Sequence, residues 1–354
     1  MEIKDFLSRV NDTKASDIFV VAGRALSYKV HGSIVDEGER LLPADTAKLV
    51  TEIYELANNR SMKVLDETGD DDFSFALPGI ARFRVNAFRQ RGSLSAVIRV
   101  INFSIPKPDI LGIPNQIIDF SNKKKGFILI TGPAGSGKST TLACMIDNIN
   151  TNRHAHIITL EDPIEYLHSH KQGIVSQREV ITDTDSYLTA LRASLRQSPD
   201  VILLGEMRDY ETMNVAMTAA ETGHLVLSTL HTIGASNTID RIIDAFPPTQ
   251  QHQIAIQLSM VLQAVVSQQL LPTVDGKVVP AFEIMTLTPA IRNMIRESKV
   301  HQIDGMIASS AADNMIAMDT SIMNLYKSGI ITEKVALSYA TNPELMEKKL
   351  KMGR

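Results

Sequence analysis

The chain has 354 residues, of which 44% are hydrophobic and 21% are charged, with 36 basic and 40 acidic side chains. This length suggests about two domains, and the apolar content excludes a chain that is mostly disordered. The net charge of −4 argues against a protein whose whole surface binds nucleic acid, and the lone cysteine, Cys144, excludes an internal disulfide or a cysteine-based zinc site.

The hydrophobicity pattern predicts a protein without a signal peptide or membrane span. The first residues, MEIKDFLSRV, lack the basic flank and apolar run of a signal peptide. The longest apolar stretch, 253–271, carries five glutamines, which makes it a poor membrane span. We therefore expect a cytoplasmic protein with no transmembrane segment.

Residues 1–103 are expected to form a small α+β domain. Two strands are predicted at 17–23 and 25–32, and a helical stretch from about 44 to 68. Three further strands are predicted at 73–79, 81–90 and 93–101, with glycine or proline between them. An antiparallel sheet with one or two helices fits this order. Three prolines in residues 104–114 then predict a semi-rigid linker at a domain boundary.

Residues 115–354 are expected to form an α/β domain. Short apolar runs at 127–131, 156–160, 201–205 and 224–230 are typical of strands buried on both faces, and helix-like segments separate them, which favours a mostly parallel sheet. Helices are predicted at 249–271, 288–298, 318–328 and 332–340, and the chain from about 288 onward forms a helical C-terminal subregion.

A phosphate-binding loop is predicted directly after the strand at 127–131. The segment matches G-x-x-x-x-G-K-[ST] and comprises Gly132, Pro133, Ala134, Gly135, Ser136, Gly137, Lys138 and Ser139, followed by Thr140. Glycines let backbone N–H groups approach phosphate oxygens, and the following helix adds the positive end of its dipole. Lys138 can reach the β- and γ-phosphates and the Ser139 hydroxyl can ligate Mg²⁺, so we expect a site for ATP and Mg²⁺. The alternative is a plain glycine-rich turn.

Acidic residues at two strand ends are candidates for organising the metal and the attacking water. Glu206 follows the run VILLG and is our candidate general base, while Glu161 follows HIITL and is a candidate for the metal shell or a second water position. Either glutamate could also hold Mg²⁺ through water. Asp162 could cap the next turn. The alternative for each acid is a strand-end carboxylate that faces solvent.

A histidine and a group of arginines extend this set of candidates. His231 lies past the end of the strand at 224–230, where it could contact the γ-phosphate. His224 stands seven residues earlier, so the two histidines are not expected to share a metal. The first domain carries five arginines within residues 82–99. Either these arginines lie on a strand face exposed to solvent, or one of them donates hydrogen bonds to a γ-phosphate as an arginine finger.

Together these motifs resemble one family, the motor ATPases of type II secretion and type IV pili. The segment LRQSPDVILLGEMRD (195–209) resembles the family signature, ITLEDPIEY (158–166) its aspartate box and GHLVLSTLHT (223–232) its histidine box. KASDIFVVAG (14–23) and ARFRVNAFRQRG (81–92) resemble its PAS-like N-terminal domain. The likeness covers about residues 1–340.

Within this family, the chain resembles the retraction motors of type IV pili, the PilT-like branch, in two features. Assembly and secretion motors carry an extra N-terminal region and commonly a four-cysteine metal insert, whereas this chain begins at the PAS-like domain and has one cysteine. The segment AIRNMIRE (290–297) also resembles the AIRNLIRE motif associated with retraction.

The resemblance implies a RecA-like P-loop ATPase core with a small N-terminal PAS-like domain and a helical C-terminal region. It further implies a homohexamer that binds ATP between subunits and acts on a pilus platform protein, at the inner face of the cytoplasmic membrane. By position, Arg84 and Arg99 match the N-terminal arginines that reach the nucleotide, Glu206 matches the catalytic Walker B glutamate, and Glu161 and His231 match positions near the γ-phosphate.

The chain departs from the family pattern at three places. Ala134 stands where the loop often has threonine, Phe19 replaces a histidine, and RALSYKVHG (24–32) replaces the usual segment. Two other functions remain as alternatives, namely an assembly or type II secretion ATPase on the same core and a RecA-like ATPase that depends on nucleic acid.

Overall fold

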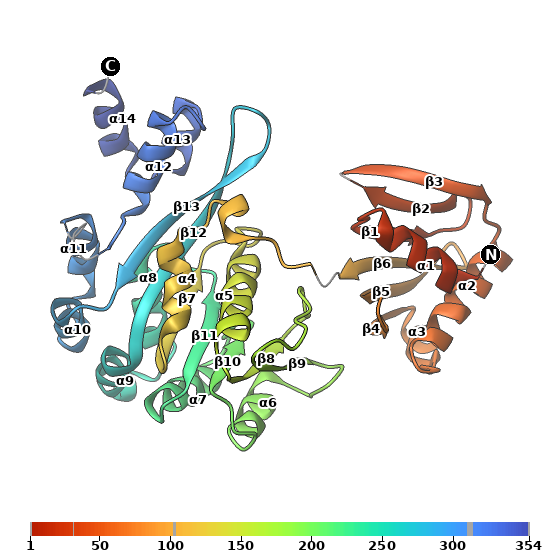
Figure 1. Cartoon of the computed structure of the whole chain (residues 1–354), viewed down its shortest axis with the longest axis horizontal. Coiled ribbons are helices and arrows are strands. Elements are labelled where there is room, and N and C mark those ends of the chain that lie inside the picture. Colours follow the sequence, from red (N-terminus) through yellow and green to blue (C-terminus); the bar gives the residue numbers. More distant parts are fainter. Residues whose placement is uncertain (1, 31, 102–103, 310–313, 353–354) are drawn as a thin grey trace. The chain divides into compact units, whose positions relative to one another are not determined.

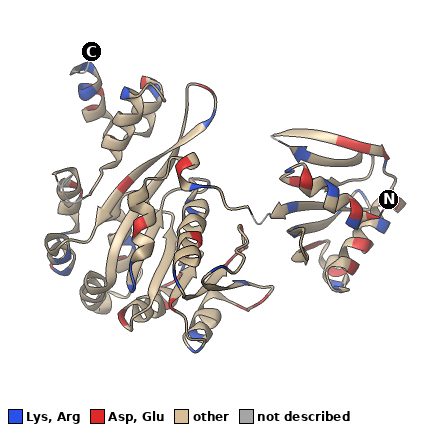
Figure 2. Cartoon of the chain, in the orientation of Figure 1, with Lys and Arg blue, Asp and Glu red and all other residues tan. Residues whose placement is uncertain are grey.

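The computed structural model describes residues 2–30, 32–101, 104–309 and 314–352, which divide into two compact units (Figure 1). The first unit is Met1–Ser104 with Glu165–Leu167, and the second is Ile105–Ile164 with His168–Arg354. Figure 2 shows acidic and basic residues interspersed over the elements of both units.

The first unit is a six-stranded antiparallel sheet in the order β3-β2-β1-β6-β5-β4, with α1 and α2 packed into its core. Its elements are α1 Ile3–Asp12, β1 Asp17–Val20, β2 Ala25–Val30, β3 Ser33–Arg40, α2 Pro43–Leu56, α3 Lys63–Thr68, β4 Asp70–Leu77, β5 Ala81–Gln90 and β6 Ser93–Ile101. In β5 alternate residues are buried, among them Phe83 and Val85, as period-2 patterning requires.

The sequence analysis of this unit missed some elements. The helical stretch predicted over about 44–68 is divided in two, because Asn58 and Asn59 adopt left-handed backbone angles (φ 57° and 55°) between α2 and α3. The strand β3 was not predicted, since its sequence SIVDEGER is exposed along nearly its whole length and carries no apolar alternation.

The second unit is a seven-stranded sheet in the order β13-β12-β7-β11-β10-β8-β9, parallel except for the edge strand β13. Its strands are β7 Gly126–Thr131, β8 His156–Glu161, β9 Ile174–Glu179, β10 Val201–Leu204, β11 Leu225–Leu230, β12 Leu262–Pro272 and β13 Val278–Thr286. Its helices up to β12 are η1 Pro108–Leu111, α4 Asn115–Asp119, η2 Phe120–Asn122, α5 Lys138–Asn152, α6 Tyr187–Ser194, α7 Tyr210–Glu221, α8 Ala235–Asp244 and α9 Pro248–Val261.

Both faces of this sheet are covered by helices. Along β7, Phe127 and Leu129 pack into a core shared with α6 to α9, whereas Ile128 and Ile130 pack into a second core shared with α4 and α5. Figure 1 shows α5 and α4 on the opposite side of the strands from α7 and α9. Four predicted strands are thereby confirmed, and their continuous apolar sequences follow from burial on both faces.

The helix predicted over 249–271 is wrong in its second half. The helix α9 ends at Val261, and the chain continues as β12, which pairs in parallel with β7 and antiparallel with β13. The β-branched pair Val265–Val266 favours a strand, and tertiary pairing on both sides decides the conformation.

The end of the chain packs on the hairpin of β12 and β13. Leu271 and Ala281 share a small core with α12 Met318–Lys327, α13 Glu333–Tyr339 and α14 Pro343–Met352. The remaining elements are α10 Pro289–Arg296, η3 Val300–Gln302 and α11 Ile303–Ser309. Helices were predicted at the positions of α10, α12 and α13, but not at those of α11 and α14.

Much of the segment 104–114, expected to be a linker, packs on the second unit. Ile113 is buried in the core beside α5, and the Cys144 thiol of α5 donates a hydrogen bond to the Pro106 carbonyl over 3.3 Å. Burial raises the pKa of the Cys144 thiol to about 11 and keeps it protonated as a donor.

The central strand β7 offers a test of the buried sheet. Leu129→Ala should destabilise the second unit by about 2–5 kcal/mol, because the side chain is fully buried and its removal leaves a cavity. Ile110→Ala, at a residue that is 80% exposed on η1, should change stability by less than about 0.5 kcal/mol. Denaturant unfolding of both variants checks this, and equal effects would contradict the packing described.

Candidate functional site

The loop between β7 and α5 has the conformation of a phosphate cradle. Gly132, Gly135 and Gly137 adopt φ of 139°, 75° and 87°, a region that side chains with a Cβ rarely enter. The Lys138 ammonium donates hydrogen bonds to the carbonyls of Gly132 and Pro133, both at 2.9 Å, and therefore lies back across the loop. Lys138, Ser139 and Thr140 form the first turn of α5, so the helix N-terminus faces the loop.

The first glycine of the loop is closely packed, and two polar side chains beside it have no partner in the described chain. A Cβ added to Gly132 would lie 2.1 Å from the Gln268 carbonyl oxygen and 2.8 Å from the Ser136 hydroxyl, so no other residue fits there. The hydroxyls of Ser136 and Thr131 are buried without a hydrogen-bond partner in the described chain. Ala134 lies between Gly132 and Gly135, in a loop that is expected to bind phosphate through its backbone N–H groups. Buried polar groups normally have partners, so these two hydroxyls fit a loop that receives phosphate oxygens.

Strand register brings the other predicted residues to the same edge. Thr131 at the end of β7 is paired with Leu230 of β11, so Gly132 and His231 leave neighbouring strands together. Leu204 of β10 is paired with Leu160 of β8, so the segments that carry Glu206 and Glu161 leave neighbouring strands at the same edge. In parallel α/β sheets ligands bind at this carboxyl edge.

Glu206 contacts two basic side chains. Its Oε2 lies 3.4 Å from His231 Nε2, and its Oε1 accepts a hydrogen bond from the Arg208 guanidinium. The Glu206 carboxylate raises the pKa of Arg208, which stays charged. Only 15% of the Glu206 side chain is exposed, so both of its oxygens are held by its own chain.

Glu161 is oriented by two donors. Its Oε1 accepts hydrogen bonds from the Thr159 hydroxyl at 2.6 Å and from the Gln177 amide at 3.3 Å. Gln177 belongs to β9, a strand that the sequence analysis did not predict. The two donors therefore fix the orientation of the Glu161 carboxylate, for which the sequence indicated only a position at the end of a strand.

Tyr187 is a member of this site that sequence analysis missed. Its hydroxyl would lie 2.8 Å from a Cβ on Gly205, the residue between β10 and Glu206. Burial raises the pKa of Tyr187, and the nearby carboxylates of Asp162, Glu206 and Glu161 add to that rise. The hydroxyl thus stays neutral among three carboxylates. Its position at the start of a helix, directly after the N-cap Ser186, gave no signal from sequence.

The loop that carries His231 is held by the β12–β13 hairpin. The Gly234 amide donates to the Ser267 hydroxyl at 3.0 Å, and the Ala235 amide donates to Glu283 at 2.8 Å. Burial raises the pKa of the Glu283 carboxyl. Sequence analysis also missed Ser267 and Glu283. The polar residues Ser267 and Gln268 within an apolar stretch were a signal that this segment contacts polar groups.

Arg84 and Arg99 lie in the first unit, on adjacent strands, and the register places them directly opposite one another. Arg84 pairs with Asp72 at 3.6 Å and Arg99 with Asp17 at 3.3 Å. Two like charges facing each other across a strand pair are unfavourable, and the two aspartates offset that repulsion. The result is a pair of guanidinium groups held on one face of the first sheet.

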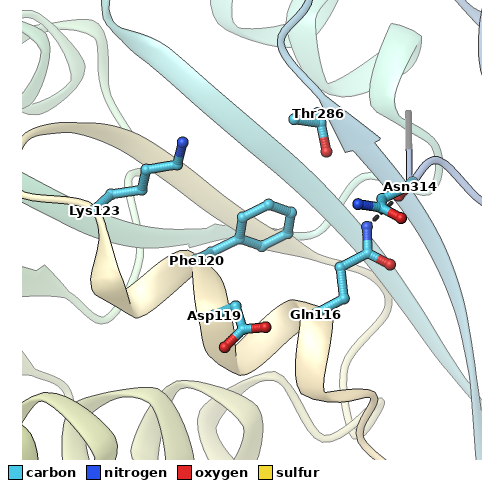
Figure 3. A pocket seen from close by; sticks show the side chains of 6 residues that line it. All are labelled: Gln116, Asp119, Phe120, Lys123, Thr286 and Asn314. Atoms are coloured by element: carbon cyan, nitrogen blue, oxygen red, sulfur yellow. Dashed lines mark hydrogen bonds between the residues drawn. The ribbon is translucent and has the colours of Figure 1, made fainter. Parts of the chain in front are cut away.

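A separate cavity of about 430 Å³ lies in the second unit and contains none of the predicted site residues (Figure 3). It is lined by Gln116, Asp119, Phe120, Lys123, Thr286 and Asn314. The Gln116 amide donates a hydrogen bond to the Asn314 carbonyl, which ties α4 to the segment after β13. The phosphate loop is therefore the better candidate site, because it carries the donors that nucleotide chemistry requires.

Paired glycine substitutions test the cradle. Gly132→Ala should abolish nucleotide binding, because its Cβ would overlap the Gln268 carbonyl oxygen. Gly135 also has a positive φ, 75° against 139° at Gly132, but its added Cβ meets nothing within 4 Å, so Gly135→Ala should weaken binding far less. Titration with a fluorescent ATP analogue measures both, and equal losses would contradict a steric role for Gly132.

Comparison with known proteins agrees with these motifs. A family model described as "Type II/IV secretion system protein" matches residues 1–328. The type IV pilus retraction ATPase PilT of Pseudomonas aeruginosa is 43% identical over 97% of this chain and 99% of its own length. A twitching motility protein of Neisseria gonorrhoeae is 44% identical over 90% of this chain and 85% of its own.

Solved structures give the same result. The crystal structure of the pilus retraction motor PilT with bound ADP superposes with a TM-score of 0.90 at 45% identity, over 98% of this chain and 99% of that one. The predicted α/β fold and the predicted family are confirmed. The chain therefore belongs to the family of type II/IV secretion system proteins.

Proposed function

We propose that the chain is an ATP-hydrolysing motor that drives retraction of type IV pili, and thus twitching motility. The observation that carries the proposal is the common edge of the second sheet, where the phosphate loop, Glu161, Glu206 and His231 leave neighbouring strands. Full-length similarity to a retraction ATPase and to a twitching motility protein supports the direction of the motor.

In the proposed mechanism each residue at the edge has a separate task. The loop N–H groups and Lys138 bind the phosphates of ATP, and Glu206 aligns the attacking water and accepts its proton. His231, 3.4 Å from Glu206, contacts the γ-phosphate and couples its presence to the base. Ser139, with Glu161 or Glu206 directly or through water, would hold Mg²⁺, which when bound screens the negative charge of the phosphates.

The two arginines of the first unit complete the site in our proposal. Each guanidinium group is planar, always charged and rich in hydrogen-bond donors, so a pair of them binds phosphate oxygens well. Since Arg84 and Arg99 are held as a facing pair, we propose that they reach a nucleotide at a subunit boundary of a homohexamer and stabilise the charge that develops at the γ-phosphate.

Partners and location follow from the same proposal. In the described parts of the chain, no helix is long and apolar enough to cross a membrane. We propose that the hexamer works at the cytoplasmic face of the inner membrane, against a pilus platform protein, and without nucleic acid. The net charge of −4 and the mixing of acidic with basic residues along the elements argue against a nucleic-acid partner.

The domain organisation gives the motor a moving part. We propose a PAS-like domain at 1–103, a proline-rich linker at 104–114 and an ATPase domain at 115–354, with hydrolysis changing the angle between the domains. Closure about a short hinge is an established switching mode. The hydrogen bond from Cys144 of α5 to Pro106 links the nucleotide-binding helix to this segment.

The catalytic assignment is tested by Glu206→Gln. Turnover should fall by about 10²- to 10⁴-fold, because the amide cannot accept the proton of water, while ATP binding persists. Glu211→Gln, at an exposed acid on α7, is the matched control and should leave turnover unchanged. Phosphate release and nucleotide titration measure the two effects. Undiminished turnover in Glu206→Gln would remove this residue from the mechanism.

The direction of the motor is tested in cells. Deletion of the gene should leave surface pili in place and abolish twitching, because assembly continues while retraction stops. Electron microscopy of pili and a surface-motility assay check this outcome. Loss of pili would favour an assembly motor, and ATPase activity strongly stimulated by single-stranded DNA would favour a nucleic-acid-dependent enzyme.

A further inference from the structure

Gln268 lies on β12 beside the start of the phosphate loop. The strand β12 runs parallel to β7, and Ser267 is paired with Thr131, the last residue before the loop. Gln268 is the next residue along and is only 3% exposed. It stands in the C-terminal third of the sequence, more than a hundred residues after the loop motif.

One residue thereby touches the loop at both ends and the helix behind it. Its side-chain oxygen accepts a hydrogen bond from the Thr141 hydroxyl of α5 at 2.8 Å, and Thr141 is itself fully buried. Its carbonyl oxygen lies against Gly132, where an added Cβ would be 2.1 Å away. Its side-chain nitrogen lies 2.9 Å from the corresponding position on Gly137.

The backbone contact requires glycine at position 132, while at Gly137 a φ of 87° favours glycine and the Gln268 side chain lies close by. The Gln268 backbone oxygen fills the space that a Cβ at Gly132 would take, and its side-chain nitrogen lies beside the corresponding space at Gly137. The strand pairing of β12 with β13 uses the backbone of Gln268, so it does not depend on the side chain. The side-chain amide therefore contacts the loop and α5, and the sheet does not need it for strand pairing.

We propose that Gln268 is a positioning residue of the phosphate loop. Its side chain fixes the distance between the loop, the start of α5 and β12, and so sets where the loop N–H groups point. Small displacements of such donors weaken binding strongly, because each donor must meet a phosphate oxygen within hydrogen-bond geometry. The inference rests on the proposed function, in which this loop binds the nucleotide.

The test compares near-isosteric variants of the full-length protein. Gln268→Met keeps the side-chain volume and removes the amide, and Thr141→Val removes only the hydroxyl donor. Gln268→Met should raise the Kd for both MgATP and MgADP by about tenfold or more, a change of about 1.4 kcal/mol in binding free energy per tenfold. Thr141→Val should raise Kd in the same direction by a smaller factor, and kcat should fall less than affinity.

The matched control is Gln269→Met, the neighbouring buried amide on the opposite face of β12. Its Kd values should stay within about twofold of the unmodified protein. The double variant Thr141→Val with Gln268→Met should bind no more weakly than Gln268→Met alone, because the two side chains form one contact. Calorimetry gives Kd, and the nucleotide-free melting temperature identifies a variant that is merely unfolded.

Several results would overturn the inference. Unchanged Kd in Gln268→Met, equal weakening in Gln269→Met, or fully additive effects in the double variant would each do so. If Gln268→Met does not fold, Thr141→Val decides, and an unchanged Kd there overturns the inference. Lys138→Ala separates this from the proposed function, because unimpaired nucleotide binding in that variant would remove the loop itself as the site.

Discussion

The structure depends on the parallel pairing of β7 with β11, which places Thr131 opposite Leu230. Because both strands end at the same level, the phosphate loop and the loop that carries His231 begin side by side. The pairing of β10 with β8 does the same for Glu206 and Glu161. Residues from four separate strands thus share one edge because their backbones pair in register. Burial on both faces of the sheet leaves that edge as the open place for polar chemistry.

The C-terminal third of the chain is part of the nucleotide-binding edge. Strand β12 lies directly beside β7, where Gln268 lies against the phosphate loop and α5 and Ser267 binds the loop that carries His231. Glu283 of β13 adds a second contact to the His231 loop. A change in the hairpin of β12 and β13 therefore acts on the phosphate loop and on the histidine loop together, while α12 to α14 pack on the far end of the same hairpin.

Particular residues show what sequence analysis could and could not find. The motif from Gly132 to Ser139 was found because its chemistry requires glycines and a lysine at fixed spacing. Glu206 and His231 were found because acids and histidines that follow apolar strands stand out. Gln177, Tyr187 and Gln268 were missed, since each acts through a contact with a residue far away in sequence. Strand β12 was mistaken for helix because a buried apolar run fits either conformation until its neighbours are known.

The sequence by itself determined the α/β class, the phosphate loop and the identity of the strand-end residues, because these depend on local patterns and on residue chemistry. Only the tertiary structure decided that Glu206 contacts both His231 and Arg208, and that Gln268 occupies the space beside Gly132 and Gly137. The tertiary structure also placed Arg84 opposite Arg99, through the register of β5 and β6. The physical reason is that register and packing join residues across long sequence separations, which local pattern does not encode.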